Sequence, residues 1–233
     1  MHVPFEWSPA DLEQTLLTLI EANSALDATL RVAIVRNHGG LFEAPNLLRK
    51  ADLIAFTTDL NNWGSGVKLG YMPHARHSAS PFAGTKYTSW AENLTWYETA
   101  HQRGFDELIL LNEHAQVSEC TSANIFAIAG DRVWTPPLET SGCLPGVTRA
   151  ILLEEVQVNG LTIAEGEMTP SELEECDGVF ITSTTRDLMP VLAIEGAPLN
   201  QADDRLADLQ RAFRRRRETY LAEAKNRKQT FAA

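Results

Sequence analysis

The stretch Gly84-Thr85-Lys86-Tyr87-Thr88-Ser89-Trp90-Ala91-Glu92-Asn93-Leu94 places a lysine shortly before a predicted helix. Apolar residues recur at helical spacing from residue 89 to about residue 103. Upstream of the lysine, residues 67–72 read as a strand that leads toward it. The stretch therefore predicts a strand, a loop that carries Lys86, and a helix, in that order along the chain.

Polar motifs follow the lysine at three later points of the chain, each beside a predicted strand or helix. They are Ser118-Glu119-Cys120-Thr121-Ser122-Ala123-Asn124-Ile125-Phe126, then Leu144-Pro145-Gly146-Val147-Thr148-Arg149, then Phe180-Ile181-Thr182-Ser183-Thr184-Thr185-Arg186-Asp187-Leu188-Met189-Pro190-Val191. The second motif places a glycine before a helix start, where exposed N–H groups bind phosphate well. The third ends a strand in a corner of hydroxyls and N–H groups that suits an anion.

The lysine stretch and these motifs together resemble the pyridoxal-phosphate enzymes of fold type IV, the class IV aminotransferase family. That family contains branched-chain aminotransferases, D-amino-acid aminotransferases and aminodeoxychorismate lyases. The resemblance covers about residues 10–215 and is strongest over residues 86–191. It implies an α+β fold, with a small α/β domain that is incomplete at its N-terminus and a larger domain with a barrel-like β core.

The resemblance also implies a role for each candidate residue around pyridoxal 5'-phosphate. Lys86 is the expected Schiff-base lysine and proton carrier, and Glu119 is the expected partner of the pyridine nitrogen. The other expected contacts are Leu144 against the pyridine ring, Val147, Thr148, Ser183 and Thr184 at the phosphate, and Thr184 and Thr185 at the substrate carboxylate. The spacing of the histidines, cysteines and acidic residues suggests no metal site.

Each candidate also has an ordinary structural interpretation. A lysine before a helix is usually a surface residue, and Glu119 can be a helix-capping or exposed glutamate. The Gly146 region can be an ordinary capped helix, and residues 182–185 can be a Ser/Thr turn. Only the order of the four motifs favours the functional interpretation.

The chain also departs from the family pattern. Family members normally have several dozen residues before the first predicted helix, including an arginine that binds the cofactor phosphate, so we expect this chain to be truncated there. Trp90 and Ala91 replace polar or tyrosine residues of many aminotransferases. Arg36, His38 and Arg76 are candidate contacts for a substrate carboxylate, with surface or salt-bridge roles as the alternative.

Composition limits the classes of partner. A net charge of -11 over 233 residues argues against a nucleic-acid binder, which needs cations to replace phosphate counterions. No apolar run approaches the roughly 20 residues of a membrane helix. The N-terminus lacks the order of a signal peptide, and the three cysteines suggest no disulfide framework. We therefore expect a cytoplasmic enzyme with no nucleic-acid or membrane partner.

Local patterns predict two domains, residues 1–62 and residues 63–233, separated by the turn-rich residues 61–66. The first is the small N-terminal domain and the second the large domain that binds pyridoxal phosphate. Helices are predicted from residue 8 onward and over residues 89–103, 148–153, 169–173 and 202–224. Strands are predicted over residues 30–35, 52–56, 67–72, 107–112, 124–129, 132–135 and 178–182, and another strand is predicted to begin near residue 117.

Three functional hypotheses follow from the resemblance. The first is an aminotransferase that moves an amino group between an amino acid, with branched-chain amino acids as the first guess, and a 2-oxo acid. The second is aminodeoxychorismate lyase, which forms 4-aminobenzoate and pyruvate with the same lysine and cofactor. The third is an inactive truncated homologue. Because the family forms homodimers, a homodimer is also expected.

Overall fold

The computed structural model describes residues 3–37, 48–199 and 204–231. The chain forms two compact units, Met1–Asn62 and Trp63–Ala233. His38, one of the candidate substrate contacts, lies outside the described residues.

The first unit consists of a helix and a two-stranded antiparallel sheet. Helix α1 spans Pro9–Ala22, and strands β1 and β2 span Thr29–Arg36 and Ala51–Thr58. The Ser8 hydroxyl caps α1 by accepting a hydrogen bond from Asp11 N at 3.1 Å. The predicted helix start and both predicted strands are confirmed.

The second unit contains the remaining elements. Its helices are α2 (Ala91–Gln102), α3 (Leu138–Ser141), α4 (Val147–Glu154), α5 (Pro170–Glu175) and α6 (Asp204–Phe231). Its strands are β3 (Val67–Met72), β4 (Glu107–Leu111), β5 (Val117–Cys120), β6 (Asn124–Ala129), β7 (Arg132–Thr135), β8 (Thr162–Glu165), β9 (Gly178–Ser183), β10 (Asp187–Ile194) and β11 (Ala197–Pro198).

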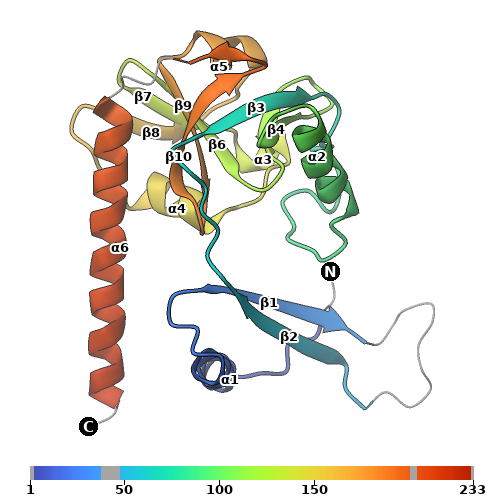
Figure 1. Ribbon diagram of the computed structural model, residues 1–233, viewed down its shortest axis with the longest axis vertical. Coiled ribbons are helices and arrows are strands. Elements are labelled where there is room, and N and C mark those ends of the chain that lie inside the picture. The colour runs from blue at the N-terminus through green and yellow to red at the C-terminus, as the bar shows by residue number, and fades with distance from the viewer. Residues whose placement is uncertain (1–2, 38–47, 200–203, 232–233) are drawn as a thin grey trace. The chain divides into compact units, whose positions relative to one another are not determined.

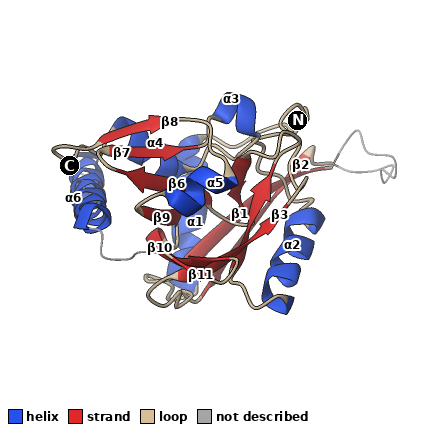
Figure 2. Cartoon of the chain, turned by 90° about the horizontal axis from the view of Figure 1, so that it is seen from above, coloured by secondary structure: helices blue, strands red, loops and turns tan. Residues whose placement is uncertain are grey.

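The strands form one mixed nine-stranded sheet with the order β5-β4-β3-β10-β9-β6-β7-β8, and β11 pairs with β10. Strand β3 is parallel to both β4 and β10, whereas β9 is antiparallel to β6 and β10. The sheet is curled, as Figure 2 shows, and α2 and α6 flank it on opposite sides (Figure 1). The predicted α+β fold with a barrel-like β core is thus confirmed.

Both faces of this sheet are buried, which explains the continuous apolar runs of its strands. One cluster includes Leu69, Ile109, Ile125 and Ile181, and the other packs Phe126 and Phe180 with their rings stacked 5.0 Å apart. Helices α4 and α6 contribute Leu152, Leu209 and Phe213 to the second cluster. Burial of this apolar area supplies the main driving force for folding.

Four elements were not assigned from the sequence: α3, β8, β10 and β11. Strand β10 contains Pro190, which cannot donate a ladder hydrogen bond and so weakens the strand pattern. The predicted C-terminal helix is found from Asp204 onward, and its first two predicted residues lie outside the described part. Among the described helices, none is both long enough and apolar enough to cross a membrane.

Candidate functional site

Lys86 lies on the loop between β3 and α2. A chain of tight turns precedes it, with hydrogen bonds from Ser80 N to His77 O, from Ala83 N to Ser80 O, and from Thr85 N to Phe82 O. The Lys86 side chain is exposed, and no hydrogen bond or ion pair joins it to another described residue.

Glu119 lies near the end of β5 and is buried, with 8% of its surface exposed. Its Oε1 accepts a hydrogen bond from Arg76 Nε at 2.9 Å, and its Oε2 accepts one from Leu144 N at 3.0 Å. A buried carboxylate needs such partners, because its loss of hydration must be compensated. Burial raises the pKa of the neighbouring Cys120 thiol, so this thiol adds no charge beside Glu119.

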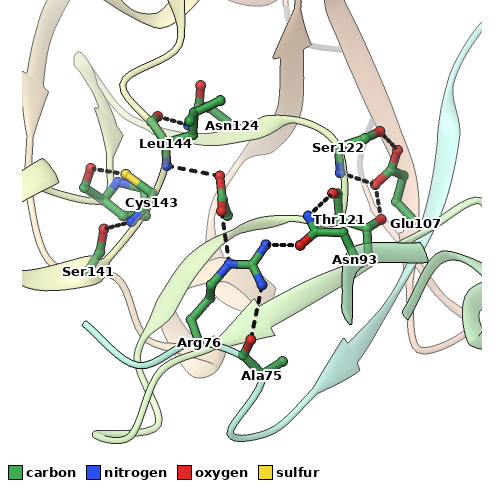
Figure 3. Close-up of polar contacts among 12 residues, drawn as sticks. Ala75, Arg76, Asn93, Glu107, Thr121, Ser122, Asn124, Ser141, Cys143 and Leu144 are labelled. Atoms are coloured by element: carbon green, nitrogen blue, oxygen red, sulfur yellow. Dashed lines mark hydrogen bonds and ion pairs between the residues drawn. The ribbon is translucent and has the colours of Figure 1, made fainter. Parts of the chain in front are cut away.

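Arg76 connects the lysine-bearing loop with β5 and α2. Besides the Glu119 pair, its Nη2 donates to Asn93 Oδ1 at 3.1 Å, and Asn93 Nδ2 donates to Thr121 O at 2.6 Å (Figure 3). Arg76 and Asn93 stand at the two ends of the segment that carries Lys86. This network therefore attaches both ends of that segment to the strand of Glu119.

The N-terminus of α4 provides unoccupied backbone donors. Its N-cap residue is Gly146, and no side chain caps the helix. The first N–H groups of a helix have no partner within the helix, and they carry the positive end of its dipole. Val147 is 70% exposed, whereas the Thr148 side chain is buried. This arrangement suits an anion.

Asn124 at the start of β6 holds the segment that leads into α4. Its Nδ2 donates to Leu144 O at 2.8 Å (Figure 3). A Cβ atom at Gly146 would overlap its Oδ1. Asn124 is also paired in the sheet with Thr182, the residue before Ser183. The α4 entry segment and the end of β9 therefore meet at Asn124.

Ser183 ends β9, and Thr184 and Thr185 form the turn into β10. The Ser183 Oγ is buried and has no hydrogen-bond partner among the described residues, whereas both threonines are exposed. A buried hydroxyl without a partner is costly unless a ligand satisfies it. This orphaned hydroxyl can donate a hydrogen bond to a polar ligand.

Arg186, which follows Thr185, holds this turn in place through buried contacts. Its Nη2 pairs with Glu107 Oε1 at 2.6 Å, and its guanidinium lies 3.7 Å from the centre of the Trp63 ring. Glu107 is fully buried and also accepts hydrogen bonds from the hydroxyls of Thr121 and Ser122. The turn at Ser183 and the turn after Glu119 are thus fastened to the same carboxylate.

The structure brings Glu119 and Leu144 into direct contact, and it joins Leu144 and Gly146 through Asn124 to the end of β9. It shows no hydrogen bond among the described residues from Lys86 or Thr185 to the other predicted site residues. Sequence analysis missed the partners of Glu119 and Glu107. The sequence did contain one signal for a buried ion pair. Glu107 is the first residue of the apolar strand β4, and a glutamate that is buried there requires a partner.

The close approach at Gly146 leads to a testable prediction. Gly146→Ala is expected to lower the free energy of unfolding by about 1–3 kcal/mol, the cost of overpacking a filled site. The added methyl must displace the buried Asn124 side chain and its hydrogen bond to Leu144 O. Urea unfolding measures the effect, with the exposed Val147→Ala as the control, expected within about 0.5 kcal/mol of the parent chain. Equal stability of the two variants would contradict the packing described here.

The curled mixed sheet has the architecture of the fold type IV proteins. The family model described as Amino-transferase class IV matches residues 1–194, and the chain belongs to that family. Members of this family depend on pyridoxal phosphate.

Known proteins of several activities are similar to this chain. The putative branched-chain-amino-acid aminotransferase of Methanocaldococcus jannaschii is 34% identical over 193 residues, which cover 82% of this chain and 67% of that protein. A D-alanine aminotransferase of Listeria monocytogenes is 34% identical over 104 residues, which cover 45% of this chain but only 35% of that protein. A putative 4-amino-4-deoxychorismate lyase from Legionella pneumophila has a similar structure, with a TM-score of 0.79 at 26% identity, covering 91% of this chain and 79% of that one.

Proposed function

We propose that this chain is a pyridoxal-phosphate-dependent aminotransferase that moves an amino group between an amino acid and a 2-oxo acid. One observation carries the proposal: the buried Glu119 carboxylate bonds to the Leu144 N–H at the entry to the uncapped helix α4. This hydrogen bond joins Glu119, the expected partner of the pyridine nitrogen, to the segment that leads into α4, where the expected phosphate donors lie. Branched-chain amino acids are the first substrate class, supported by the similarity to the M. jannaschii protein.

The residues fit the cofactor by their chemistry. The orphaned Ser183 hydroxyl and the N–H groups at the start of α4 are donors that a phosphate can use. Each oxygen of the Glu119 carboxylate retains a second lone pair beyond its Arg76 or Leu144 bond, so Glu119 can still accept from a ring N–H. Lys86 supplies an exposed amine for an aldehyde. Bound there, the cofactor supplies an electron sink.

Each side chain then has one task. Lys86 would hold the cofactor covalently, and its amine, once released by the amine of the bound substrate, would accept the proton that leaves the substrate α-carbon. Glu119 would accept the hydrogen bond of the ring nitrogen, and Leu144 would pack against the ring. Val147, Thr148, Ser183 and Thr184 would bind the phosphate, and Thr184 and Thr185 would donate to the substrate carboxylate. These assignments are proposals that the variants below test.

The experiment that tests the function supplies the purified chain with pyridoxal phosphate and compares three substrates. L-leucine or D-alanine with 2-oxoglutarate should yield a new amino acid and a new 2-oxo acid if the chain is an aminotransferase. Pyruvate released from 4-amino-4-deoxychorismate without an amino acceptor would select the lyase instead, which the similarity to the Legionella protein supports. No product in any assay would favour an inactive homologue.

Glu119→Gln is expected to lower turnover by about 10²-fold, the scale for loss of one key electrostatic contact. The amide has no charge to keep the ring nitrogen protonated, and its NH₂ group faces the Leu144 N–H or the Arg76 guanidinium. Steady-state kinetics and a cofactor titration measure the effect. The exposed Glu98→Gln serves as the control, because Glu98 forms no hydrogen bond or ion pair with a described residue. Full activity of Glu119→Gln would show that Glu119 does not have the proposed role.

We also propose a homodimer and a cytoplasmic location, both on the strength of family membership. Light scattering of the purified chain tests the dimer, with a mass of twice 25.8 kDa as the expected result. A monomer that carries out the reaction would contradict it.

A further inference from the structure

The carboxylate of Glu113 lies outside the proposed site and contacts the first part of the loop that carries Lys86. Its Oε2 accepts a hydrogen bond from Ser78 N at 2.9 Å, and its Oε1 accepts one from Ser78 Oγ at 2.8 Å. Ala79 N lies 3.4 Å from the same Oε1, and His77 Nδ1 lies 3.2 Å from it. Donors from three consecutive loop residues thus converge on one carboxylate.

Glu113 lies in a turn that hydrogen bonds to Asn112 hold in place. Asn112 is fully buried, and its Oδ1 accepts hydrogen bonds from His114 N at 2.9 Å and Gln116 N at 3.0 Å. The turn joins β4 to β5, and β5 carries Glu119. One hairpin therefore holds both the loop anchor and the proposed partner of the ring nitrogen.

Ser78 is confined on its other side by Gly142. A Cβ atom at Gly142 would lie 3.0 Å from Ser78 Cα, so the two backbones are in close contact. Gly142 O also accepts a hydrogen bond from Gly84 N at 3.3 Å. Ser78 thus lies between Glu113 and the segment that continues to Leu144.

The turns that follow Ser78 transmit its position to Lys86. Hydrogen bonds link residue 77 with 80, residue 80 with 83, and residue 82 with 85, so that no extended segment separates Ser78 from Lys86. A loop of this length needs such anchors to hold one conformation. Hydrogen bonds to the carboxylate, of which that from the Ser78 N–H has the largest effect, lower the pKa of Glu113 from 4.5 to about 2, so the anchor is ionised at neutral pH.

We propose that Glu113 is a positioning residue for Lys86, acting through Ser78 and the turns between them. This inference rests on the proposed function, because it assigns Glu113 a part in presenting the reactive amine. Glu113 is not among the residues proposed to bind the cofactor or the substrate. Its effect should therefore appear in the rate at which Lys86 reacts and not in the affinity of the phosphate-binding donors.

The test compares Glu113→Gln with Glu98→Gln, an exposed glutamate on α2 without a hydrogen bond or ion pair to a described residue. In Glu113→Gln an amide NH₂ faces loop donors, so the converging hydrogen bonds cannot all form. Without cofactor, hydrogen exchange over residues 77–86 should become faster, while exchange over β6 stays unchanged. With pyridoxal phosphate, borohydride trapping and mass spectrometry measure the rate of attachment to Lys86.

The limiting attachment rate of Glu113→Gln should fall by about 10-fold, within the ~10²-fold that a 1 Å misplacement can cost. The cofactor concentration that gives half the limiting rate should stay the same, and Glu113→Asp should recover part of the rate. Unchanged exchange over residues 77–86, or an unchanged attachment rate, would overturn the inference. Failure of the parent chain to attach cofactor at Lys86 would instead overturn the proposed function.

Discussion

Lys86→Ala is expected to abolish covalent retention of pyridoxal phosphate and to lower turnover by more than about 10³-fold, the scale seen when other enzymes lose a covalent nucleophile. The reason is chemical, because no other group in the proposed site offers an amine to an aldehyde. The Lys86 side chain is exposed and unpaired among the described residues, so its removal should leave the free energy of unfolding within about 0.5 kcal/mol. Borohydride trapping followed by peptide mass spectrometry measures the retention.

Two further variants make this result specific. Lys68→Ala removes another exposed lysine of the same unit, on β3, and should retain cofactor attachment and activity. Lys86→Arg keeps the positive charge without a nucleophilic amine, and it should fail in the same way as Lys86→Ala. Retained attachment in Lys86→Ala would place the reactive lysine elsewhere in the chain and would remove the basis of the proposed function.

Arg186→Met is expected to lower the free energy of unfolding by about 3–5 kcal/mol, the cost of leaving one member of a buried ion pair without its partner. Glu107 has no exposed surface, and among the described residues it would retain only the donors of Thr121 and Ser122. Loss of the guanidinium also removes its contact with the Trp63 ring. Urea unfolding followed by tryptophan fluorescence measures the effect.

The double variant Glu107→Gln with Arg186→Met separates two causes of the lost stability, the unpaired buried charge and the lost packing of the arginine side chain. Because the double variant no longer buries an ion, it should recover a large part of the stability lost in Arg186→Met. Arg214→Met, at an exposed position of α6, provides the control for loss of an arginine. A loss of less than about 1 kcal/mol in Arg186→Met would show that the pair is not the anchor described here.

The buried ion pair of Arg186 and Glu107 also holds the turn after Ser183 in place. Arg186 follows Thr185 directly and fastens the turn to the carboxylate that binds Thr121 and Ser122. Thr121 and Ser122 donate hydrogen bonds to Glu107, and Asn124 donates one to Leu144 O, so these three residues hold Glu107 and Leu144 in place.

Local patterns were sufficient for most of the elements. The N-cap at Ser8, the strand at residues 67–72 and the hairpin of β6 and β7 follow from side-chain spacing and from the residues that end each element. Strand β10 was missed because Pro190 interrupts its pattern, while its neighbours β3 and β9 supply the pairing. Tertiary pairing thus overrode a weak local signal.

The sequence by itself determined the family, because four motifs in a fixed order carry it, and it predicted which residues the proposed chemistry would use. Only the tertiary structure decided which groups support them: Arg76 with Glu119, Arg186 with Glu107, and Glu113 with Ser78. These partners lie 43, 79 and 35 residues apart in the chain. Spacing along a chain reports neighbours within one helix or strand, whereas the pairing of distant charges depends on how the sheet curls and on the strict need of a buried charge for a partner.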